Sequence, residues 1–591
     1  MAQIISTSAE RLQRNIEKRL TVRFGSLIVC GILLISVFFR CWHLDMIPGV
    51  NGDEAWLGWK AFEVAHGGHL DWRTNSGNFT DPFYILPLIA LHKLLSPSAV
   101  LLRSVALVSG ILMLPVNFFL CRLVFEQRTA MASTLILAVL PVNIFYSRFG
   151  WEPSQSVLFA VPMLYATLIF CSGRVSLPIG SLIVCGSLLM AMVVHPTNFF
   201  LSGFCVPAFS ALLTRPESGS RKRLAAFISL SVLGCLVFVI IALICVPPDL
   251  REEMMGRLLA LTWLGDGKDF LIAWIRMFNG INSMVTLMGA WPMATEVLFK
   301  PKHPHIYWID LAGWMIFASA LLSLWIGIER QSVRSSSGRK DVLAFFARQD
   351  IVLMVGFLLT SLMFDLLNGP GKVACWNDRY GLWAVPAGAL ILSRGAVRMG
   401  ELFPSRCRLL KCCGVLLCAL LLMEAWQGYF GIALSTGGNT SLESRVGVRE
   451  IKLQAAQQLI TAVSKQLGAT KTTHPVLVSS DWFVYWPIVY FLRQGVGWKQ
   501  WETVLEKLYP QYGDQRGWDL AQAVGEGRVA FADFSNSYAW GVWDEVILKA
   551  GVAYSTTILR DRSGHDVLTL KVPTKWLAQA DRGSLKAGNW Q

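Results

Sequence analysis

The sequence predicts a polytopic α-helical membrane protein with about eleven transmembrane helices, followed by a soluble C-terminal α/β domain. Of the 591 residues, 54% are hydrophobic and 16% are charged, and the mean hydropathy is +0.48. That much apolar surface does not fit inside one soluble core. Apolar runs of about 18 or more residues recur as far as residue 430, whereas the residues after it are polar enough for a small folded domain.

Each apolar run gives the approximate position of one transmembrane helix. Lipid offers the backbone no hydrogen-bond partner, so each run is expected to satisfy its own backbone groups as a helix. The first run follows a basic segment and lacks a small-residue cleavage site, which indicates a retained anchor rather than a removed signal peptide. The expected spans are 22–40, 100–124, 129–147, 154–171, 176–194, 197–214, 224–246, 306–328, 349–367, 379–395 and 410–430.

The basic residues predict the orientation of the chain. Lys and Arg gather in alternate connections, on the side of the N-terminus, and this bias marks the cytoplasmic side. These loops account for the net charge of +14, so the sequence gives no reason to expect nucleic-acid binding. Short cytoplasmic loops and the lack of an organelle-retrieval ending favour a bacterial inner membrane. The periplasm then receives 41–99, 148–153, 247–305, 368–378 and 431–591.

The tail, residues 431–591, alternates between helical and strand patterns. Residues 448–469 have an apolar period typical of a helix, and three short segments read as strands: 474–483, 527–535 and 565–573. Tryptophans in the tail are candidates for stacking on sugar rings or for anchoring at the bilayer surface, although core packing is the commoner role. They include Trp482, Trp486, Trp498, Trp501, Trp518, Trp540 and Trp543.

The first outward loop, 41–99, carries two adjacent acids in the stretch NGDEAW, residues 51–56. An isolated acidic pair usually only solvates a loop. Here Asp53 and Glu54 precede the aromatic stretch AWLGWKAFEVAHGG, which is typical of an interfacial helix with acids at its N-terminal end. A carboxylate held there would lie within reach of lipid headgroups. Further along, 81–95 is apolar but too short to span, so it is expected to lie along the membrane surface.

Three other outward turns also carry ionisable groups. YSRFGWEPS, residues 146–154, contains Arg148 and Glu152, and the stretch 368–386 combines a Gly-rich turn with several charged residues. His195 interrupts an apolar run at its outward end, where hydrogen bonding at the helix terminus is the simplest role. The basic groups in these turns are either phosphate ligands or side chains that snorkel to the interface. The candidates in 368–386 are Lys372, Arg379 and Tyr380.

Four motifs in this order resemble the GT-C superfamily of polyprenyl-phosphate-sugar-dependent glycosyltransferases. They are the acidic pair after one anchor helix, RSVALVSG at 103–110, SRFGWE at 147–152 and DRYGLWAVP at 378–386. The likeness is greatest to the branch with protein O-mannosyltransferases and the aminoarabinose transferase of lipid A. It covers roughly residues 20–400, and each motif is short, so their order and common sidedness carry the resemblance.

The resemblance implies a periplasm-facing enzyme whose donor is a sugar on a polyprenyl phosphate. Asp53 then corresponds to the catalytic base, with Glu54 as its acidic neighbour and Glu152 as the acid of the second loop. The substrate-binding groups are Arg379 as the phosphate ligand beside Tyr380, with Lys372, Arg148 and His195 as further candidates.

The chemistry of such a reaction fits the residues. A lipid-linked donor agrees with the absence of a nucleotide-binding G-x-G-x-x-G motif or a P-loop. A partly buried carboxylate suits the removal of a proton from an acceptor hydroxyl or amine, and guanidinium groups suit the departing phosphate. Direct displacement needs one base and inverts the anomeric configuration. Glu54 or Glu152 is the alternative ligand for a divalent cation such as Mg or Mn, or for sugar hydroxyls.

A secondary transporter is the alternative from another class. Ionisable groups within apolar spans often form an ion or substrate path, and the relevant acids are Asp310, Asp365 and Glu424. All three lie near outward ends, and no inverted repeat is visible, which favours the transferase. The acceptor stays open between an envelope glycan, a lipid and a protein.

Overall fold

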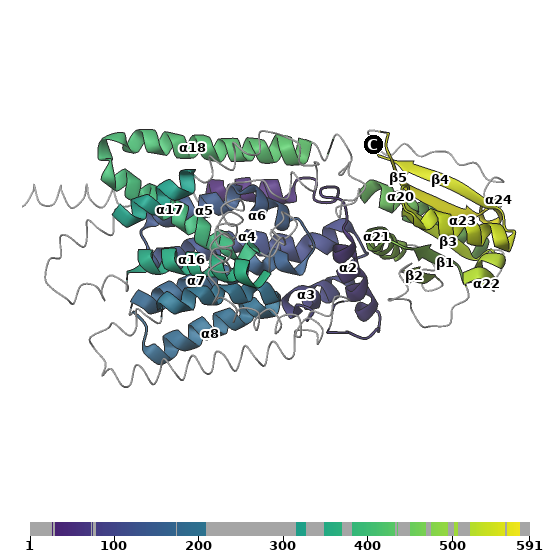
Figure 1. The fold of residues 1–591 in the computed structure, drawn as a ribbon, viewed down its shortest axis with the longest axis horizontal. Coiled ribbons are helices and arrows are strands. Elements are labelled where there is room, and N and C mark those ends of the chain that lie inside the picture. Colours follow the sequence, from purple (N-terminus) through teal and green to yellow (C-terminus); the bar gives the residue numbers. More distant parts are fainter. Residues whose placement is uncertain are drawn as a thin grey trace, which may run out of the picture.

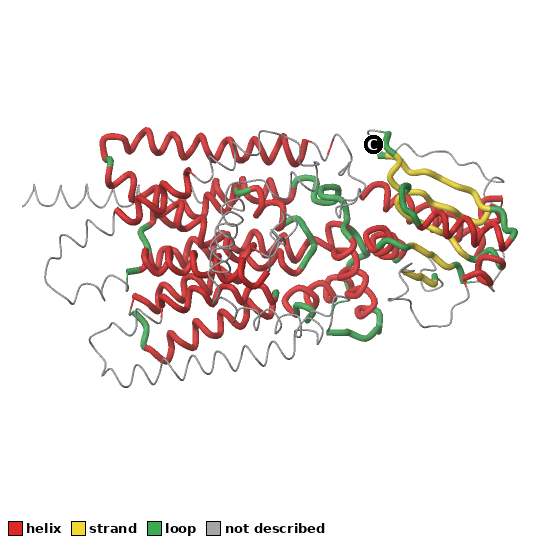
Figure 2. Tube along the Cα trace, in the orientation of Figure 1, coloured by secondary structure: helices red, strands yellow, loops and turns green. Residues whose placement is uncertain are grey.

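A computed structural model describes a helical bundle joined to a small mixed sheet (Figure 1). The bundle and the sheet lie at opposite ends of the molecule, and all the strands are in the sheet end (Figure 2). The expected span 224–246 and the loop 247–305 lie outside the described residues. Apart from a few single residues, the structure describes 30–72, 79–172, 174–208, 315–326, 348–368, 381–431, 449–467, 474–494, 501–505, 520–561 and 564–578.

Within these ranges, two helices are long and apolar enough to cross a membrane: Ala99–Val124 and Glu152–Ser172. Shorter apolar helices occupy parts of several other expected spans, so the number of eleven stays a prediction. The helices of the bundle are Cys30–Cys41, α4 (Ala99–Val124), α5 (Gln127–Val139), α6 (Pro141–Tyr146), α7 (Ser156–Ser172), α8 (Leu177–Val194), Met315–Ile326, α16 (Gln349–Asn368), α17 (Val385–Leu402) and α18 (Cys407–Glu424).

Several expected spans differ from a continuous α-helix within the described residues. The run 129–147 divides into α5 and α6, because Pro141 has no N–H to donate and Leu140 before it is extended. The run that begins at 197 opens as a 3₁₀ helix, η2 (Pro196–Phe204), again with proline at its start. Shorter irregular turns are η1 (Glu152–Gln155), η5 (Pro404–Arg406) and the π-helical turn η6 (Ala425–Gly431).

The sheet has five strands in the order β2-β1-β3-β5-β4. The three central strands, β1 (Val476–Ser479), β3 (Val529–Phe534) and β5 (Asp566–Pro573), lie in the segments where the sequence predicts strands. β1 runs parallel to β2 and β3, whereas β5 is antiparallel to β3 and β4. The remaining elements here are α20 (Arg449–Leu467), α21 (Trp482–Leu492), β2 (Glu502–Leu505), α22 (Leu520–Gly525), α23 (Ala539–Ala550), β4 (Tyr554–Arg560) and α24 (Thr574–Ala578).

Two helices of the first outward loop, α2 (Gly52–Ala65) and α3 (Pro82–His92), lie between the bundle and the sheet (Figure 1). One buried hydrophobic cluster runs through α2, α3, α20, α21 and the sheet. At its edge, the Tyr490 hydroxyl accepts a hydrogen bond from the Ser98 N–H at 3.0 Å, and Arg493 pairs with Glu63 at 3.0 Å. The tail and the first loop therefore share one core, as residues on the same side of a membrane can.

Candidate active site

The helix α2 begins at the acidic pair. Asn51 caps it, with its side-chain oxygen accepting the Asp53 N–H at 2.8 Å, and the Glu54 carboxylate accepts the Asn51 N–H at 3.3 Å. This reciprocal capping box satisfies N–H groups that a helix start otherwise leaves without partners. The structure thus has the helix that the sequence predicts, with acids in its first turn.

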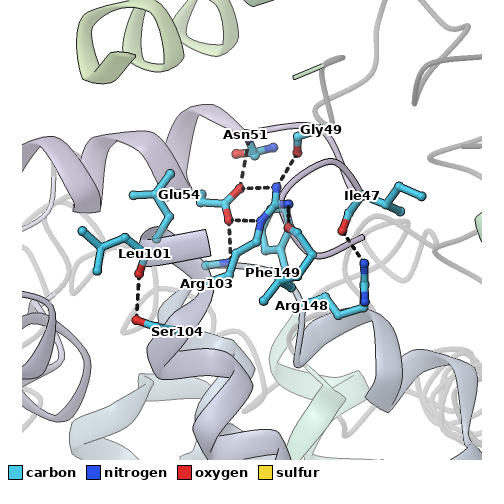
Figure 3. Close-up of polar contacts among 12 residues, drawn as sticks. Ile47, Gly49, Asn51, Glu54, Leu101, Arg103, Ser104, Arg148 and Phe149 are labelled. Atoms are coloured by element: carbon cyan, nitrogen blue, oxygen red, sulfur yellow. Dashed lines mark hydrogen bonds and ion pairs between the residues drawn. The ribbon is translucent and has the colours of Figure 1, made fainter. Parts of the chain in front are cut away.

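Glu54 forms a buried ion pair with Arg103 of α4 (Figure 3). The Arg103 Nε lies 2.8 Å from Glu54 Oε1 and its Nη2 lies 3.3 Å from Oε2, and both side chains are fully buried. The guanidinium also donates to the carbonyls of Leu44, at 2.7 Å, and Gly49, at 3.2 Å. The Gly150 N–H donates to Glu54 Oε1 at 3.0 Å. One carboxylate therefore joins α2, α4 and the turn before α7.

These contacts occupy both oxygens of Glu54 and hold the start of α2 against α4. The surroundings leave no spare room, since a Cβ added to Gly150 would lie 2.7 Å from Glu54 Oε1 and 2.8 Å from the carbonyl oxygen of Leu102. A glycine is required there for the backbone to approach the carboxylate. Of the two acids, Asp53 is the one whose carboxylate faces the tail.

Asp53 is half-buried and accepts a hydrogen bond from the indole N–H of Trp482, the first residue of α21, at 2.9 Å. Its charge also interacts with that of Glu152. The buried Glu152 carboxylate in turn accepts the Asp81 N–H at 3.2 Å, through Oε1. Glu152 therefore links the two other acidic residues, since it interacts with the charge of Asp53 and accepts the backbone N–H of Asp81.

Asp81 caps α3 through Oδ1, which accepts the Phe83 N–H at 2.8 Å. Burial, and then the charge of Glu152, raise the pKa of Asp81 well above its ordinary value, although two backbone hydrogen bonds lower it. Its Oδ2 and the Oε1 of Gln155 are buried and accept no hydrogen bond from the described residues. A buried carboxyl group and a buried amide oxygen in that position suit a ligand that can both donate and accept hydrogen bonds, such as sugar hydroxyls.

A divalent cation stays a prediction. Carboxylates of the kind found here are hard oxygen ligands that suit Mg or Mn. Across the described ranges, however, no group of three or more His, Cys, Asp or Glu side chains is arranged to hold a metal ion.

Arg148 and His195 are both engaged inside the protein. The Arg148 guanidinium is fully buried and donates to the carbonyls of Phe39, Arg40, Trp42 and Ile47 at 2.7–2.9 Å. The side chain therefore does not snorkel to an interface, and Nη1 and Nη2 have no N–H left to donate to a phosphate. Arg148 instead ties the first helix to the turn before η1. His195 caps η2 and contacts the Thr197 hydroxyl at 2.7 Å, which is the helix-end role expected from the sequence.

Three expected substrate ligands, Lys372, Arg379 and Tyr380, lie outside the described residues. So does Asp310, one of the acids of the transporter alternative. Of the motif 378–386, the described part is core, since Trp383 is buried and packs against the rings of Phe200 and Phe364.

Sequence reasoning included Arg103 and Asp81 in named segments but assigned neither a role, and it named Trp482 only among the tryptophans of the tail. The ion pair of Arg103 could have been expected from the sequence, because a charged residue inside an apolar run normally has a partner. Asp81 precedes Pro82, as helix caps often do. Nothing in the sequence pairs Trp482 with Asp53, because they are separated by more than four hundred residues.

We predict that Glu54→Gln lowers the stability of the protein sharply. The change leaves the buried Arg103 without a counter-charge, and breaking such a pair typically costs about 3–5 kcal/mol. Thermal unfolding in detergent micelles measures the effect. The exposed acid Glu545, which pairs with Lys549, provides the control, and Glu545→Gln should leave the melting temperature unchanged. Similar melting temperatures for the two variants would contradict the role of the ion pair.

Asp81→Asn should change how stability depends on pH. The raised pKa means that the folded state holds a proton that the unfolded chain releases near pH 4, so wild-type stability falls as the pH rises from that value. The asparagine cannot titrate, so its melting temperature should fall less between pH 4 and pH 7. Parallel melting curves for the two proteins over this range would show that Asp81 is not buried as a protonated acid.

Comparison with protein-family models finds no match, and neither does comparison with curated protein sequences. Among solved structures, apo ArnT from Cupriavidus metallidurans matches with a TM-score of 0.50 at 13% identity, over 93% of this chain and 98% of ArnT. ArnT bound to undecaprenyl phosphate matches at 0.47 and 13%, over 93% and 97%. AglB from Archaeoglobus fulgidus, an oligosaccharyltransferase in complex with an inhibitory peptide and a dolichol-phosphate, matches at 0.45 and 11%, over 94% and 74%. The chain therefore shares the fold of apo ArnT, in agreement with the fold that the sequence resemblance implies.

Proposed function

We propose that this protein is an integral membrane glycosyltransferase that transfers a sugar from a polyprenyl-phosphate-linked donor to an acceptor. The interactions of Glu152 with both Asp53 and Asp81 carry the proposal, because they link the acid at the first turn of α2 to two buried acids and so give a helical membrane fold an acidic centre. The likeness in fold to ArnT supports it. We place the centre at the periplasmic face of a bacterial inner membrane, which the basic loops favour.

In the proposed reaction, Asp53 acts as the base. An acceptor hydroxyl or amine attacks the anomeric carbon, the bond from that carbon to the phosphate oxygen breaks, and the proton of the acceptor passes to the Asp53 carboxylate. The leaving group is the polyprenyl phosphate, which keeps the electron pair of the broken bond. A single displacement of this kind inverts the anomeric configuration.

Asp53 has a suitable position for this role. It lies in the first turn of α2, where the helix dipole favours an anion, and it is only half-buried, so an acceptor can approach it. Glu54 holds the helix in place through Arg103 and takes no part in the proton transfer. Glu152 and Asp81 bind the sugar hydroxyls or a divalent cation, with Asp81 in its protonated form able to donate a hydrogen bond.

The phosphate ligands are proposed from the sequence. A cation that faces the leaving phosphate stabilises the negative charge that develops there. Arg379 is the first candidate, with Tyr380 beside it and Lys372 behind. The acceptor, whether glycan, lipid or protein, and the choice of hexose or pentose are left for experiment.

We predict that Asp53→Asn abolishes transfer while the protein stays folded and inserted, because the amide cannot accept the proton. The assay combines the purified protein, envelopes from a strain that lacks it, and undecaprenyl phosphate carrying radiolabelled hexoses or pentoses, and it counts label attached to envelope components. Asp71→Asn, in the same loop, is the control and should retain activity. Unchanged transfer by Asp53→Asn would remove Asp53 from the role of base.

Arg379→Ala should raise the donor concentration needed for half-maximal transfer by at least tenfold, because it removes a charge-assisted contact to phosphate. Arg215→Ala, on the expected cytoplasmic side, provides the comparison. The same kinetics for both variants would argue against a phosphate site at Arg379.

A further inference from the structure

We propose that Trp482, in the tail, is a positioning residue for Asp53, so that the tail completes the reaction centre. This inference rests on the proposed function, since it concerns how the base of that reaction is held. Trp482 is the first residue of α21, and the cap of that helix is its neighbour Asp481, whose Oδ1 accepts the Phe483 N–H at 2.7 Å. The indole is therefore fixed at the beginning of a well-capped helix.

The first turns of α2 and α21 are in direct contact. The Trp482 Nε1–H donates to Asp53 Oδ1 at 2.9 Å. A Cβ added to Gly52 would lie 2.4 Å from the indole Cδ1 and 2.7 Å from the Trp482 carbonyl oxygen. Because this carbonyl belongs to the backbone, it cannot rotate away, and only glycine allows the indole to reach the neighbouring aspartate.

Other contacts keep the two helices in register. In α20, the buried Lys452 donates to the carbonyl of Val50, just before α2, at 3.1 Å. At the far end of α21, Arg493 pairs with Glu63 of α2 at 3.0 Å. The indole of Trp482 also packs edge-to-face on that of Trp486, with ring centroids 5.4 Å apart. The donor is thus held by contacts on both sides of it.

A neutral donor at this position does two things for a base. It restricts rotation of the Asp53 carboxylate, so that the acceptor always meets the same geometry. It also favours the ionised form, which is the form able to take a proton, without cancelling the negative charge as a cation would. The hydrogen bond spans the first loop and the tail, so this part of the centre exists only when the tail is docked.

The test compares Trp482→Phe with Trp486→Phe. Both changes remove one indole N–H from α21 and keep an aromatic ring, but within the described residues the N–H of Trp486 has no hydrogen-bond partner. We expect Trp482→Phe to lower kcat on the order of tenfold, the value of a hydrogen bond to a charged group, with little change in KM for the donor. The acidic limb of its pH–rate profile should move to higher pH. Trp486→Phe should stay within about twofold of wild type, because it removes no hydrogen bond.

The charged groups around Asp53 are the same in both variants. Glu152 interacts with the charge of Asp53, and in the tail Lys452 interacts with those of Asp481 and Glu54; all of these groups are retained in both Trp482→Phe and Trp486→Phe, so they do not distinguish the two variants. Should Trp482→Phe fail to fold, as judged by size-exclusion chromatography and melting temperature, Gly52→Ala provides a second variant. It keeps the indole but pushes it away, and it should show the same loss of kcat and the same shift in pH profile.

The outcomes separate this inference from the proposed function. Equal activity of Trp482→Phe and Trp486→Phe, in a wild-type background that is active and an Asp53→Asn variant that is not, would overturn the positioning role alone. If kcat falls for Trp482→Phe but the acidic limb of the pH–rate profile does not shift, Trp482 contributes only packing. That result would also overturn its positioning role. A wild-type protein that transfers none of the labelled sugars would overturn the proposed function and this inference with it.

Discussion

The buried ion pair between Glu54 and Arg103 is the constraint on which the rest of the site depends. Neither charge can be left alone in an apolar interior, because an unpaired buried ion costs several kcal/mol. The pair therefore fixes α2 against α4, and Gly150 brings the turn before α7 to the same carboxylate. Successive residues of a helix differ by about 100° in direction. Once Glu54 faces Arg103, Asp53 has to face elsewhere, toward the tail and Glu152.

The tail contacts α2 through the edge of its sheet at the carboxyl ends of β1 and β3. β1 lies between β2 and β3, all parallel, and the chain crosses from one side of β1 to the other. In open α/β sheets, the carboxyl ends of the strands at such a reversal are where ligand sites usually form. Asp481 and Trp482 follow the carboxyl end of β1, and Asp533 near the end of β3 accepts the Ser480 hydroxyl and N–H. Burial raises the pKa of Asp533 to about 6. The edge of the sheet nearest Asp53 is therefore the one that carries the ionisable side chains of Asp481 and Asp533.

The sequence predicted the parts of the molecule that depend on local pattern. The helix at the acidic pair, the apolar helices α4, α7 and α8, and the strands β1, β3 and β5 all occur where periodicity and composition place them. Proline explains why α5 ends early, and that effect was visible in the sequence only as an isolated residue in an apolar run. β2 and β4 were missed because they are edge strands, whose pattern is weaker.

Pairings between distant segments could not be predicted in the same way. The ion pair of Glu54 was not predictable because its partner Arg103 lies 49 residues away, and the contacts of Arg148 were not predictable because its carbonyl partners belong to the first helix and the turn that follows it. Asp53, by contrast, is half-buried and interacts with the charge of Glu152, and its role as base stays a prediction. Which acid reacts and which only holds the fold is decided by tertiary contacts.

The side of the membrane on which Asp53 lies is the central claim, and labelling single cysteines with an impermeant thiol reagent in spheroplasts tests it most directly. In a background without the native cysteines, Trp72→Cys in the first loop and Leu548→Cys in the tail report on exposed positions, and Ser336→Cys reports on the expected cytoplasmic loop. We expect the first two to react in intact spheroplasts and the third only after lysis. Labelling of residues 72 and 548 only after lysis would contradict the account.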